Sequence, residues 1–270
     1  MSQPVPDEEE LRAVLTGVHP GLTNFRRRLK RIPSSPRCKL CTAPFAGLGG
    51  AVLGHFGFGR YDGNPALCNM CIKKFSSNGI TGAEIPVTLL FADVRGSTAI
   101  AEGMRPTEFH TFLDRFYRIG SEAIVRHDGL IDKLVGDEII GLFFGGVSGP
   151  DHAAAAIAAA IDLMTEVGRA DGPNAPIPVG AAVHTGEAYV GTTAPDGVIN
   201  DFTALGDVVN TTARLAAAAA AGEILVSDAA AVEGRRDTGR DERRTLEVRG
   251  RDGRIEVVVL RPTAEVTAPA

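Results

Sequence analysis

The spacing of hydrophobic residues changes along the chain, and these changes predict where its elements begin. Short apolar runs typical of buried strands occur at 87–91, 179–184, 188–190, 223–226, 246–248 and 255–260. Apolar residues three or four positions apart predict helices from Pro106 to just before Gly129, over 151–169 and over 207–221. Residues 130–144 indicate two strands joined by a turn at Gly136 and Asp137. The resulting βαββαβ order predicts an α+β domain with a ferredoxin-like core.

Changes in composition divide the chain into segments. The segments that we predict are a partly helical, basic arm (1–37), a four-cysteine module (38–75), a linker (76–84), a main domain (85–262) and a tail (263–270). In the arm, the helical spacing of Leu11, Val14 and Leu15 is interrupted at Pro20 and Gly21. The linker is indicated by the sequence Ser76-Ser77-Asn78-Gly79.

Composition and charge narrow the possible classes of protein. The 270 residues are 44% hydrophobic and 23% charged, which is typical of a soluble globular chain. A net charge of −5 argues against a protein whose whole surface binds nucleic acid. The run Arg26–Arg31 could contact nucleic acid or anionic lipid, but we expect a solvated helix face or an interdomain contact.

The first residues and the apolar runs lead to an expected location. The opening MSQPVPDEEE lacks the basic and apolar regions of a secretory signal. The apolar runs at 153–160 and 215–221 are much shorter than the ~20 residues needed to span a bilayer. We therefore expect a cytoplasmic protein without a membrane span.

The four cysteines form two CxxC pairs, Cys38/Cys41 and Cys68/Cys71. In a reducing compartment such pairs are metal ligands more often than disulfides. Their spacing predicts a zinc-ribbon-like site, although an iron–sulfur cluster also takes four cysteines. His55 is an alternative ligand in the glycine-rich gap, but a lone loop histidine is more often plain polar surface.

Two aspartates follow the predicted strands at positions that bring them together. Asp93 ends the strand at 87–91, and Asp137 lies in the turn of the next hairpin. If these strands are neighbours, the carboxylates project from the same end of the sheet and suit Mg²⁺ or Mn²⁺. Taken alone, each aspartate is better explained as an ordinary turn residue, because aspartate is common in turns.

Three motifs carry a resemblance to a known family. The stretches are Phe91-Ala92-Asp93-Val94-Arg95-Gly96-Ser97-Thr98, Lys133-Leu134-Val135-Gly136-Asp137, and 203–215, which reads TALGDVVNTTARL. In order and spacing they resemble the motifs of class III nucleotide cyclases, over residues 85–262. The resemblance implies a bacterial-type adenylate cyclase catalytic domain behind the four-cysteine module.

The resemblance also implies a reaction and a metal site. Class III cyclases convert a nucleoside triphosphate to a 3′,5′-cyclic monophosphate and pyrophosphate. Asp93 and Asp137, with the backbone carbonyl of Val94, would then hold two Mg²⁺ or Mn²⁺ ions per active site. The residues that would line the phosphates are Gly96, Ser97 and Thr98.

Further roles follow from the same resemblance. Arg214 would stabilise charge on the α-phosphoryl group, and Asn210, one helical turn earlier, would orient the ribose. Lys133 and Thr203 would select adenine, because a lysine can donate to N1 and a hydroxyl can accept from the N6 amino group. Thr203 departs from the commoner aspartate. Arg249 would bind the β- and γ-phosphates, although its match to the family's motif is loose.

Plainer explanations exist for two of these residues. Arg214 could be a solvated helix residue, and Thr203 an ordinary strand residue. The family's active site lies between two catalytic domains, so a single chain with the complete set implies a head-to-tail homodimer.

We therefore expect an adenylate cyclase that acts on ATP. Its N-terminal module would be structural, or regulatory by analogy with the sensors that precede other cyclases. The alternatives are an inactive nucleotide-binding regulator of the same fold, or a zinc-dependent nucleic-acid-binding protein.

Overall fold

The computed structural model describes residues 8–76, 81–169, 175–193, 201–247 and 254–262. The chain forms two compact units, neither of which is continuous in sequence. The first unit comprises Met1–Val87, Phe144–Pro150 and Glu187–Gly206, and the second comprises Thr88–Phe143, Asp151–Gly186 and Asp207–Ala270. Residues 77–80 of the expected linker (76–84) and the expected tail (263–270) lie outside the described residues.

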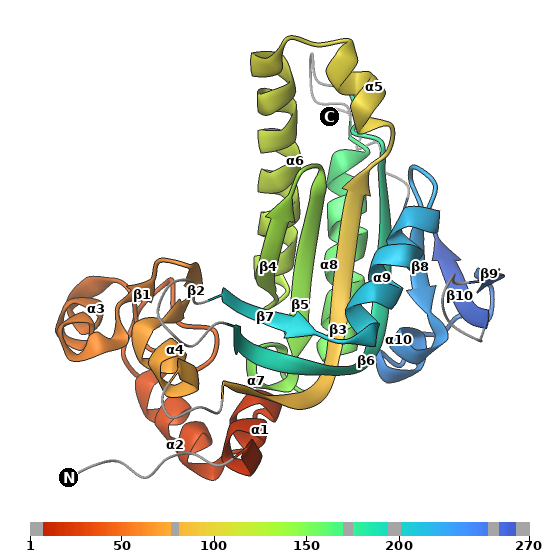
Figure 1. Ribbon diagram of the computed structural model, residues 1–270. Coiled ribbons are helices and arrows are strands. Elements are labelled where there is room, and N and C mark those ends of the chain that lie inside the picture. Colours follow the sequence, from red (N-terminus) through yellow and green to blue (C-terminus); the bar gives the residue numbers. More distant parts are fainter. Residues whose placement is uncertain (1–7, 77–80, 170–174, 194–200, 248–253, 263–270) are drawn as a thin grey trace, which may run out of the picture. The chain divides into compact units, whose positions relative to one another are not determined.

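The first unit combines the N-terminal segment with two short pieces from later in the chain. Its N-terminal elements are α1 (Glu8–Thr16), α2 (Pro20–Leu29), α3 (Gly47–Leu53), the irregular turn η1 (Gly54–Phe58), β1 (Arg60–Tyr61), β2 (Asn64–Cys68) and α4 (Asn69–Ser76) (Figure 1). The later pieces are α7 (Gly145–Ser148) and β7 (Asp201–Leu205).

Local sequence explains how the first two helices begin. Leu11, Val14 and Leu15 are buried, as their helical spacing predicts, and α1 has acidic residues in its first turn, where they complement the helix dipole. Pro20 occupies a first-turn position of α2, where its missing N–H costs nothing. The N–H of Leu22 donates to His19 Nδ1 at 3.1 Å, which caps this helix. The interruption predicted at Pro20 is therefore a helix start.

Two glycines of α7 allow a close approach to α1. A Cβ at Gly146 would lie 2.5 Å from the carbonyl oxygen of Leu15, and one at Gly145 would clash with that of Thr16. Only glycine permits backbones to meet at this distance. Residues about 130 positions apart are thereby joined within the first unit.

The second unit contains most of a mixed β-sheet and the helices that cover it. Its elements are α5 (Ser97–Glu102), α6 (Pro106–Arg126), β4 (Leu130–Val135), β5 (Glu138–Phe144), α8 (His152–Val167), α9 (Asp207–Ala218), β8 (Ile224–Ser227), α10 (Asp228–Glu233), β9 (Glu242–Glu247) and β10 (Arg254–Leu260). Strands β3 (Gly82–Val94) and β6 (Val179–Thr193) contribute residues to both units. The sheet order is β4-β5-β3-β6-β8-β10-β9, and β7 pairs with β6.

The predicted ferredoxin-like core is confirmed. Its order in sequence is β3-α6-β4-β5-α8-β6, and its order in the sheet is β4-β5-β3-β6. Helices α6 and α8 both lie behind the sheet in the view of Figure 1. The buried cluster beneath them includes Phe116 and Ile124 of α6, Leu163 of α8, Leu90 of β3 and Phe143.

Two strand predictions need correction. The separate strands predicted at 179–184 and 188–190 are one continuous strand, β6. Gly186 lies between the two predicted segments and within β6, where it makes room for α9, since a Cβ there would lie 3.1 Å from Val208. The strand predicted at 246–248 is β9, which runs from Glu242 to Glu247. Leu246 is the one hydrophobic residue of the strand sequence ERRTLE, so the pattern indicated the end of the strand but not its start at Glu242.

Within the parts of the chain that the structure describes, no helix is both long and apolar enough to cross a membrane.

Candidate active site and four-cysteine centre

The two aspartates predicted to bind metal lie at neighbouring ends of adjacent strands. Asp93 is the penultimate residue of β3, and Asp137 lies in the β4–β5 turn, where Gly136 has a φ of +62°. Because β5 lies beside β3 in the sheet, the turn comes against the end of β3. The N–H of Val94 donates to the carbonyl oxygen of Asp137 at 3.1 Å. The structure therefore brings both aspartates and Val94 together.

The acidic side chains at this site lie close enough to affect one another's pKa values. Burial raises the pKa of Asp93 to about 6, and the carboxylate of Asp137 adds to the rise. The guanidinium of Arg95, whose Nη2 lies 2.7 Å from Asp93 Oδ2, opposes it. Burial and both aspartates also raise the pKa of Glu138 to about 7. Three carboxyl groups close together, of which Asp93 and Glu138 have raised pKa values, fit a divalent cation, which takes carboxylate oxygens and offsets their charge.

Glu138 is the member of this group that our sequence reasoning missed. It directly follows Asp137 and begins β5, so its half-buried side chain shares the field of the two aspartates. Its adjacency to Asp137 was the available signal, but strand alternation alone does not place its carboxylate near Asp93. Nearby, the hydroxyl of Tyr117 donates to the carbonyl oxygen of Gly136. Burial and then Asp137 raise the pKa of Tyr117.

The residues predicted to line phosphates lie at the β3–α5 junction. Gly96 has a φ of +69°, a left-handed conformation that favours glycine, and no atom lies within 4 Å of where its Cβ would be. Ser97 begins α5, and Thr98 is exposed. Gly96 thus serves the turn rather than a close contact within the chain.

The remaining predicted residues of the second unit lie on α9 and β4. Asn210 and Arg214 are exposed and one helical turn apart, so they share a face of α9. Val208, Thr212 and Leu215 of the same helix are buried. On β4, the Nζ of Lys133 lies 3.8 Å from Asp132 Oδ2.

Thr203 lies in the first unit, in the middle of β7. It pairs with Gly191 of β6 and is only 3% exposed. The Thr203 side chain is therefore shielded from solvent. Arg249, the proposed phosphate contact, lies outside the described residues.

The four cysteines converge in the first unit, as their paired spacing predicts. All four Sγ atoms lie within 4.8 Å of one another, with Cys38–Cys71 at 3.8 Å and Cys41–Cys68 at 3.6 Å. These distances exclude S–S bonds, which are about 2.05 Å long. They match the edge of about 3.8 Å of a tetrahedron with metal–sulfur bonds of about 2.3 Å. His55 is not part of this group and is exposed beside Phe56.

Backbone contacts hold the cysteine loops in position. The N–H of Cys38 donates to Ala43 at 2.9 Å, and that of Lys39 donates to Ala66 of β2 at 2.8 Å. Hydrogen bonding from the Cys38 sulfur raises the pKa of Cys41 and of Cys71, since neighbouring sulfurs resist ionising together. A bound cation relieves this repulsion, so the donor set fits a single thiophilic ion.

A family model described as "Adenylate and Guanylate cyclase catalytic domain" matches residues 83–261. An adenylate cyclase of Anabaena cylindrica is 33% identical over 159 residues, which are 54% of this chain and 31% of that protein. Adenylate cyclase 1 of Rhizobium meliloti is 32% identical over 136 residues, 48% of this chain and 20% of that protein. The chain thus aligns with less than a third of the length of these two relatives.

Solved cyclase structures share the fold. The guanylyl cyclase Cya2 matches with a TM-score of 0.63 and 25% identity, covering 69% of this chain and 97% of that one. The adenylyl cyclase CyaB from P. aeruginosa matches with a TM-score of 0.59 and 25% identity, covering 66% and 95%. The family match extends over well over half of the chain and includes both aspartates. The chain therefore belongs to the family of adenylate and guanylate cyclase catalytic domains.

Proposed function

We propose that this protein is an adenylate cyclase that converts ATP to 3′,5′-cyclic AMP and pyrophosphate. The observation that carries the proposal is the convergence of Asp93 and Asp137 at adjacent strand ends, where burial and mutual repulsion raise the pKa of Asp93 to about 6. Exposed Asn210 and Arg214 supply the other polar groups that the reaction needs.

Asp93, Asp137 and the carbonyl of Val94 would hold two Mg²⁺ or Mn²⁺ ions. Such ions lower the pKa of the ribose 3′-hydroxyl and offset the charge of the triphosphate. Arg214 would donate to the α-phosphoryl oxygens, because its planar guanidinium can bind two of them at once. Asn210 would orient the ribose, and Gly96, Ser97, Thr98 and Arg249 would contact the phosphates.

Lys133 supports ATP rather than GTP as the substrate. Its ammonium group can donate to N1 of adenine, whereas guanine carries a hydrogen at N1 and cannot accept there. The Thr203 hydroxyl would accept from the adenine amino group. Since Thr203 is buried in the protomer, this contact requires β7 to present its side chain differently in the nucleotide-bound state.

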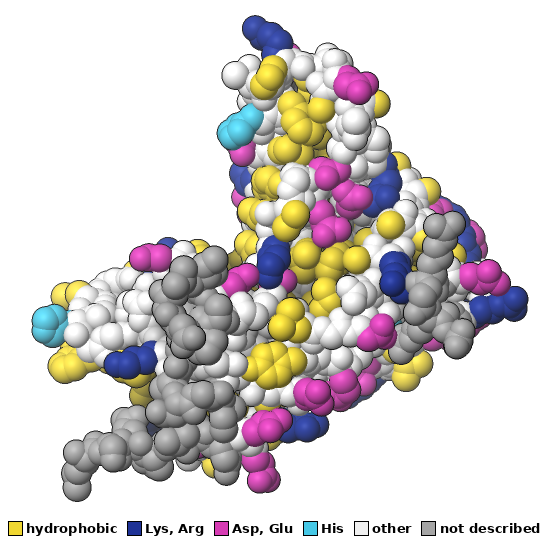
Figure 2. All heavy atoms as spheres, in the orientation of Figure 1, with side chains coloured by type: hydrophobic (Ala, Val, Ile, Leu, Met, Phe, Trp, Pro, Cys, Tyr) yellow, Lys and Arg dark blue, Asp and Glu magenta, His cyan; other side chains and the backbone are white. Residues whose placement is uncertain are grey.

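A head-to-tail homodimer would complete the site, with the aspartates from one chain and Lys133, Thr203, Asn210 and Arg214 from the other. Apolar side chains exposed beside Lys133 support an interface there: Leu134 is 47% exposed and Val135 55%. On the face seen in Figure 2, Lys and Arg side chains are scattered among acidic ones, so it offers no continuous basic surface for nucleic acid. We expect the protein to act in the cytoplasm.

Zinc is the ion that we propose for the four cysteines, in a structural role. All four sulfurs lie close enough to share one ion, whereas an iron–sulfur cluster needs them spread around several metal atoms. Elemental analysis should find one zinc per chain, and the purified protein should be colourless. One iron per two cysteines or more, with visible absorption, would refute the assignment.

The direct test is an assay of the purified full chain with ATP and Mn²⁺ or Mg²⁺. Cyclic AMP should form with wild type and be lost with Asp93→Ala. ATP binding without product would instead indicate a catalytically inactive regulator. Mixing Asp93→Ala with Arg214→Ala chains should restore activity, up to one intact site per heterodimer. A mixture as inactive as its components would contradict the shared site.

A further inference from the structure

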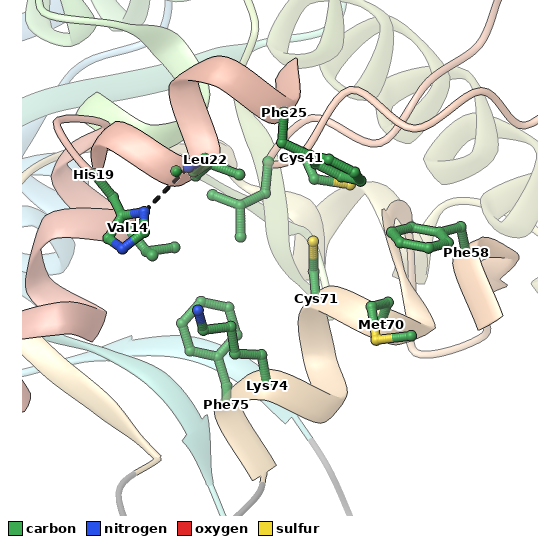
Figure 3. A pocket seen from close by; sticks show the side chains of 12 residues that line it. Val14, His19, Leu22, Phe25, Cys41, Phe58, Met70, Cys71, Lys74 and Phe75 are labelled. Carbon is green, nitrogen blue, oxygen red and sulfur yellow. Dashed lines mark hydrogen bonds between the residues drawn. The ribbon is translucent and has the colours of Figure 1, made fainter. Parts of the chain in front are cut away.

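A cavity of about 360 Å³ lies in the first unit, directly beside the four-cysteine centre. Its walls come from α1, α2, η1 and α4, and two of the cysteines, Cys41 and Cys71, face it (Figure 3). This volume is within the range of small-molecule sites, which begins at about 300 Å³. The cyclase reaction proposed above uses none of the residues that line it.

The body of the cavity is apolar and largely aromatic. Phe25 of α2 and Phe58 at the end of η1 face each other with ring centroids 5.8 Å apart, and Phe75 of α4 forms another wall. Phe25 is 36% exposed and Met70 is 40% exposed, so the cavity opens at the surface between apolar side chains. Such walls favour a flat ring that can stack or meet ring edges.

Both polar, non-sulfur side chains that line the cavity are hydrogen-bond donors: His19 and Lys74. The Nδ1 of His19 accepts from the N–H of Leu22, so its Nε2 carries the hydrogen. The Nε2 of His19 and the Nζ of Lys74 lie 3.7 and 2.7 Å from the same oxygen of Glu10. They therefore share one end of the cavity, and the three N–H groups of a lysine can serve a ligand together with Glu10.

From this arrangement we propose that the cavity binds a small aromatic carboxylic acid of one or two rings. The rings lie among Phe25, Phe58 and Phe75, and the carboxylate accepts from Lys74 and His19. The carboxylate would form charge-assisted hydrogen bonds with the Lys74 ammonium, which are about twice as strong as bonds between neutral groups.

A ligand in the cavity would contact a side chain that packs against β7, the strand that carries Thr203. Phe75 lines the cavity, and its ring also packs on Phe202 of β7 with centroids 5.4 Å apart. The carbonyl oxygen of Phe75 accepts from the Thr192 hydroxyl of β6 at 3.3 Å. The bound acid therefore acts on β7, and its effect on cyclase activity rests on the proposed function of Thr203.

Binding is tested with 2-naphthoate and its neutral counterpart 2-naphthalenemethanol, by titration calorimetry on the zinc-loaded full chain. We expect saturable binding of naphthoate at one site per chain and at least tenfold weaker binding of the alcohol. Leu22→Trp, which fills the cavity, should abolish binding, whereas Val18→Trp on the exposed surface should retain it. Lys74→Met should weaken binding about tenfold, and Lys73→Met should not.

The absence of saturable binding, equal binding of the alcohol, or binding retained in Leu22→Trp would overturn the site. Zinc content and melting temperature confirm that each variant is folded.

The effect on β7 is measured without relying on cyclase activity. Naphthoate should slow hydrogen exchange of the β7 amides at 201–205 in wild type and leave it unchanged in Leu22→Trp. In an active enzyme, the KM for ATP should also change. Exchange that is identical with and without the bound acid would overturn the link to β7. An inactive chain that shows slowed exchange would contradict the cyclase proposal alone.

Discussion

At the scale of single residues, the site depends on acidic groups held close together against their repulsion. Asp93 and Glu138 both have raised pKa values, and burial is the largest cause for each. Arg95 opposes the shift at both residues without cancelling it. Among the described residues Arg95 is paired with Asp93, and a divalent cation would offset the negative charge that Arg95 leaves.

Replacing Asp93 with alanine should lower the cyclase turnover number on the order of 10²–10³-fold, because it removes a preorganised charge. Arg214→Ala should have a similar effect. Asp114→Ala is the matched control, since Asp114 is an exposed aspartate that ion-pairs only with the exposed His110 among the pairs described here. Initial rates at saturating ATP and Mn²⁺ measure the difference. Equal rates for Asp93→Ala and Asp114→Ala would remove Asp93 from the site.

The raised pKa values also predict how stability changes with pH. Since the folded state holds protons on Asp93 up to about pH 6 and on Glu138 up to about pH 7, stability falls as pH rises from about 4 through 7. Without added Mg²⁺ or Mn²⁺, the melting temperature of the zinc-loaded wild type should therefore fall further over this range than that of the variant Asp93→Asn/Glu138→Gln. If the difference in melting temperature between wild type and variant stays constant with pH, the raised pKa values of Asp93 and Glu138 are contradicted.

Substrate selectivity should depend on two side chains. Lys133→Glu combined with Thr203→Cys removes the donor to adenine N1 and supplies an acceptor that suits guanine. We expect the ratio of kcat/KM for ATP to that for GTP to fall, which competition between the two nucleotides measures. An unchanged ratio for ATP and GTP would mean that residues other than Lys133 and Thr203 recognise the base.

At the scale of elements, the apolar pattern predicted the core well because α6 and α8 each bury one regular face, and β3 and β5 are buried along almost their whole length. It failed where glycine serves packing instead of turning. The apolar runs on either side of Gly186 were predicted as separate strands, although Gly186 lies within β6 and makes room for Val208. The start of strand β9 was missed because its contacts there join charged groups: Arg244 donates to both oxygens of Glu223. Long-range contacts of this kind leave no periodic signal in a sequence.

The close approach of backbone at Gly191 tests whether glycine is required for packing within a strand. A Cβ at Gly191 of β6 would clash with the carbonyl oxygen of Thr81, so Gly191→Ala should destabilise the protein by roughly 1–3 kcal/mol. Gly54→Ala is the control, because Gly54 has a φ of −57° and open space around its Cβ position. Thermal melting of zinc-loaded protein compares them. A Gly191→Ala melt matching that of Gly54→Ala would contradict the clash.

At the scale of the whole molecule, the motifs located the aspartates and the cysteines, since their spacing is local. The cavity beside the cysteines could not be predicted, because it exists only where α1, α2, η1 and α4 pack together. The burial of Thr203 was equally hidden. It accompanies the pairing of β7 with β6, which places Thr203 opposite Gly191.

Loss of the proposed zinc should loosen more than the cysteine loops. Cys38→Ser removes one of four ligands, and we expect faster hydrogen exchange in β2 and α4 and also in β7, through Phe75 and Phe202. Exchange in α8, whose residues lie in the second unit, is the internal reference. Faster exchange confined to 38–71 would contradict this connection.

The contacts that close the first unit also set a schedule for synthesis on the ribosome. Helix α1 emerges early, yet its glycine partners on α7 follow about 130 residues later, and Phe202 follows Phe75 by a similar interval. The earliest part of the chain to be made is thus among the last to be completed. Until then the apolar side chains that these later segments cover lack their final partners and are open to chaperones. The four cysteines need no later segment, because all of them lie between 38 and 71.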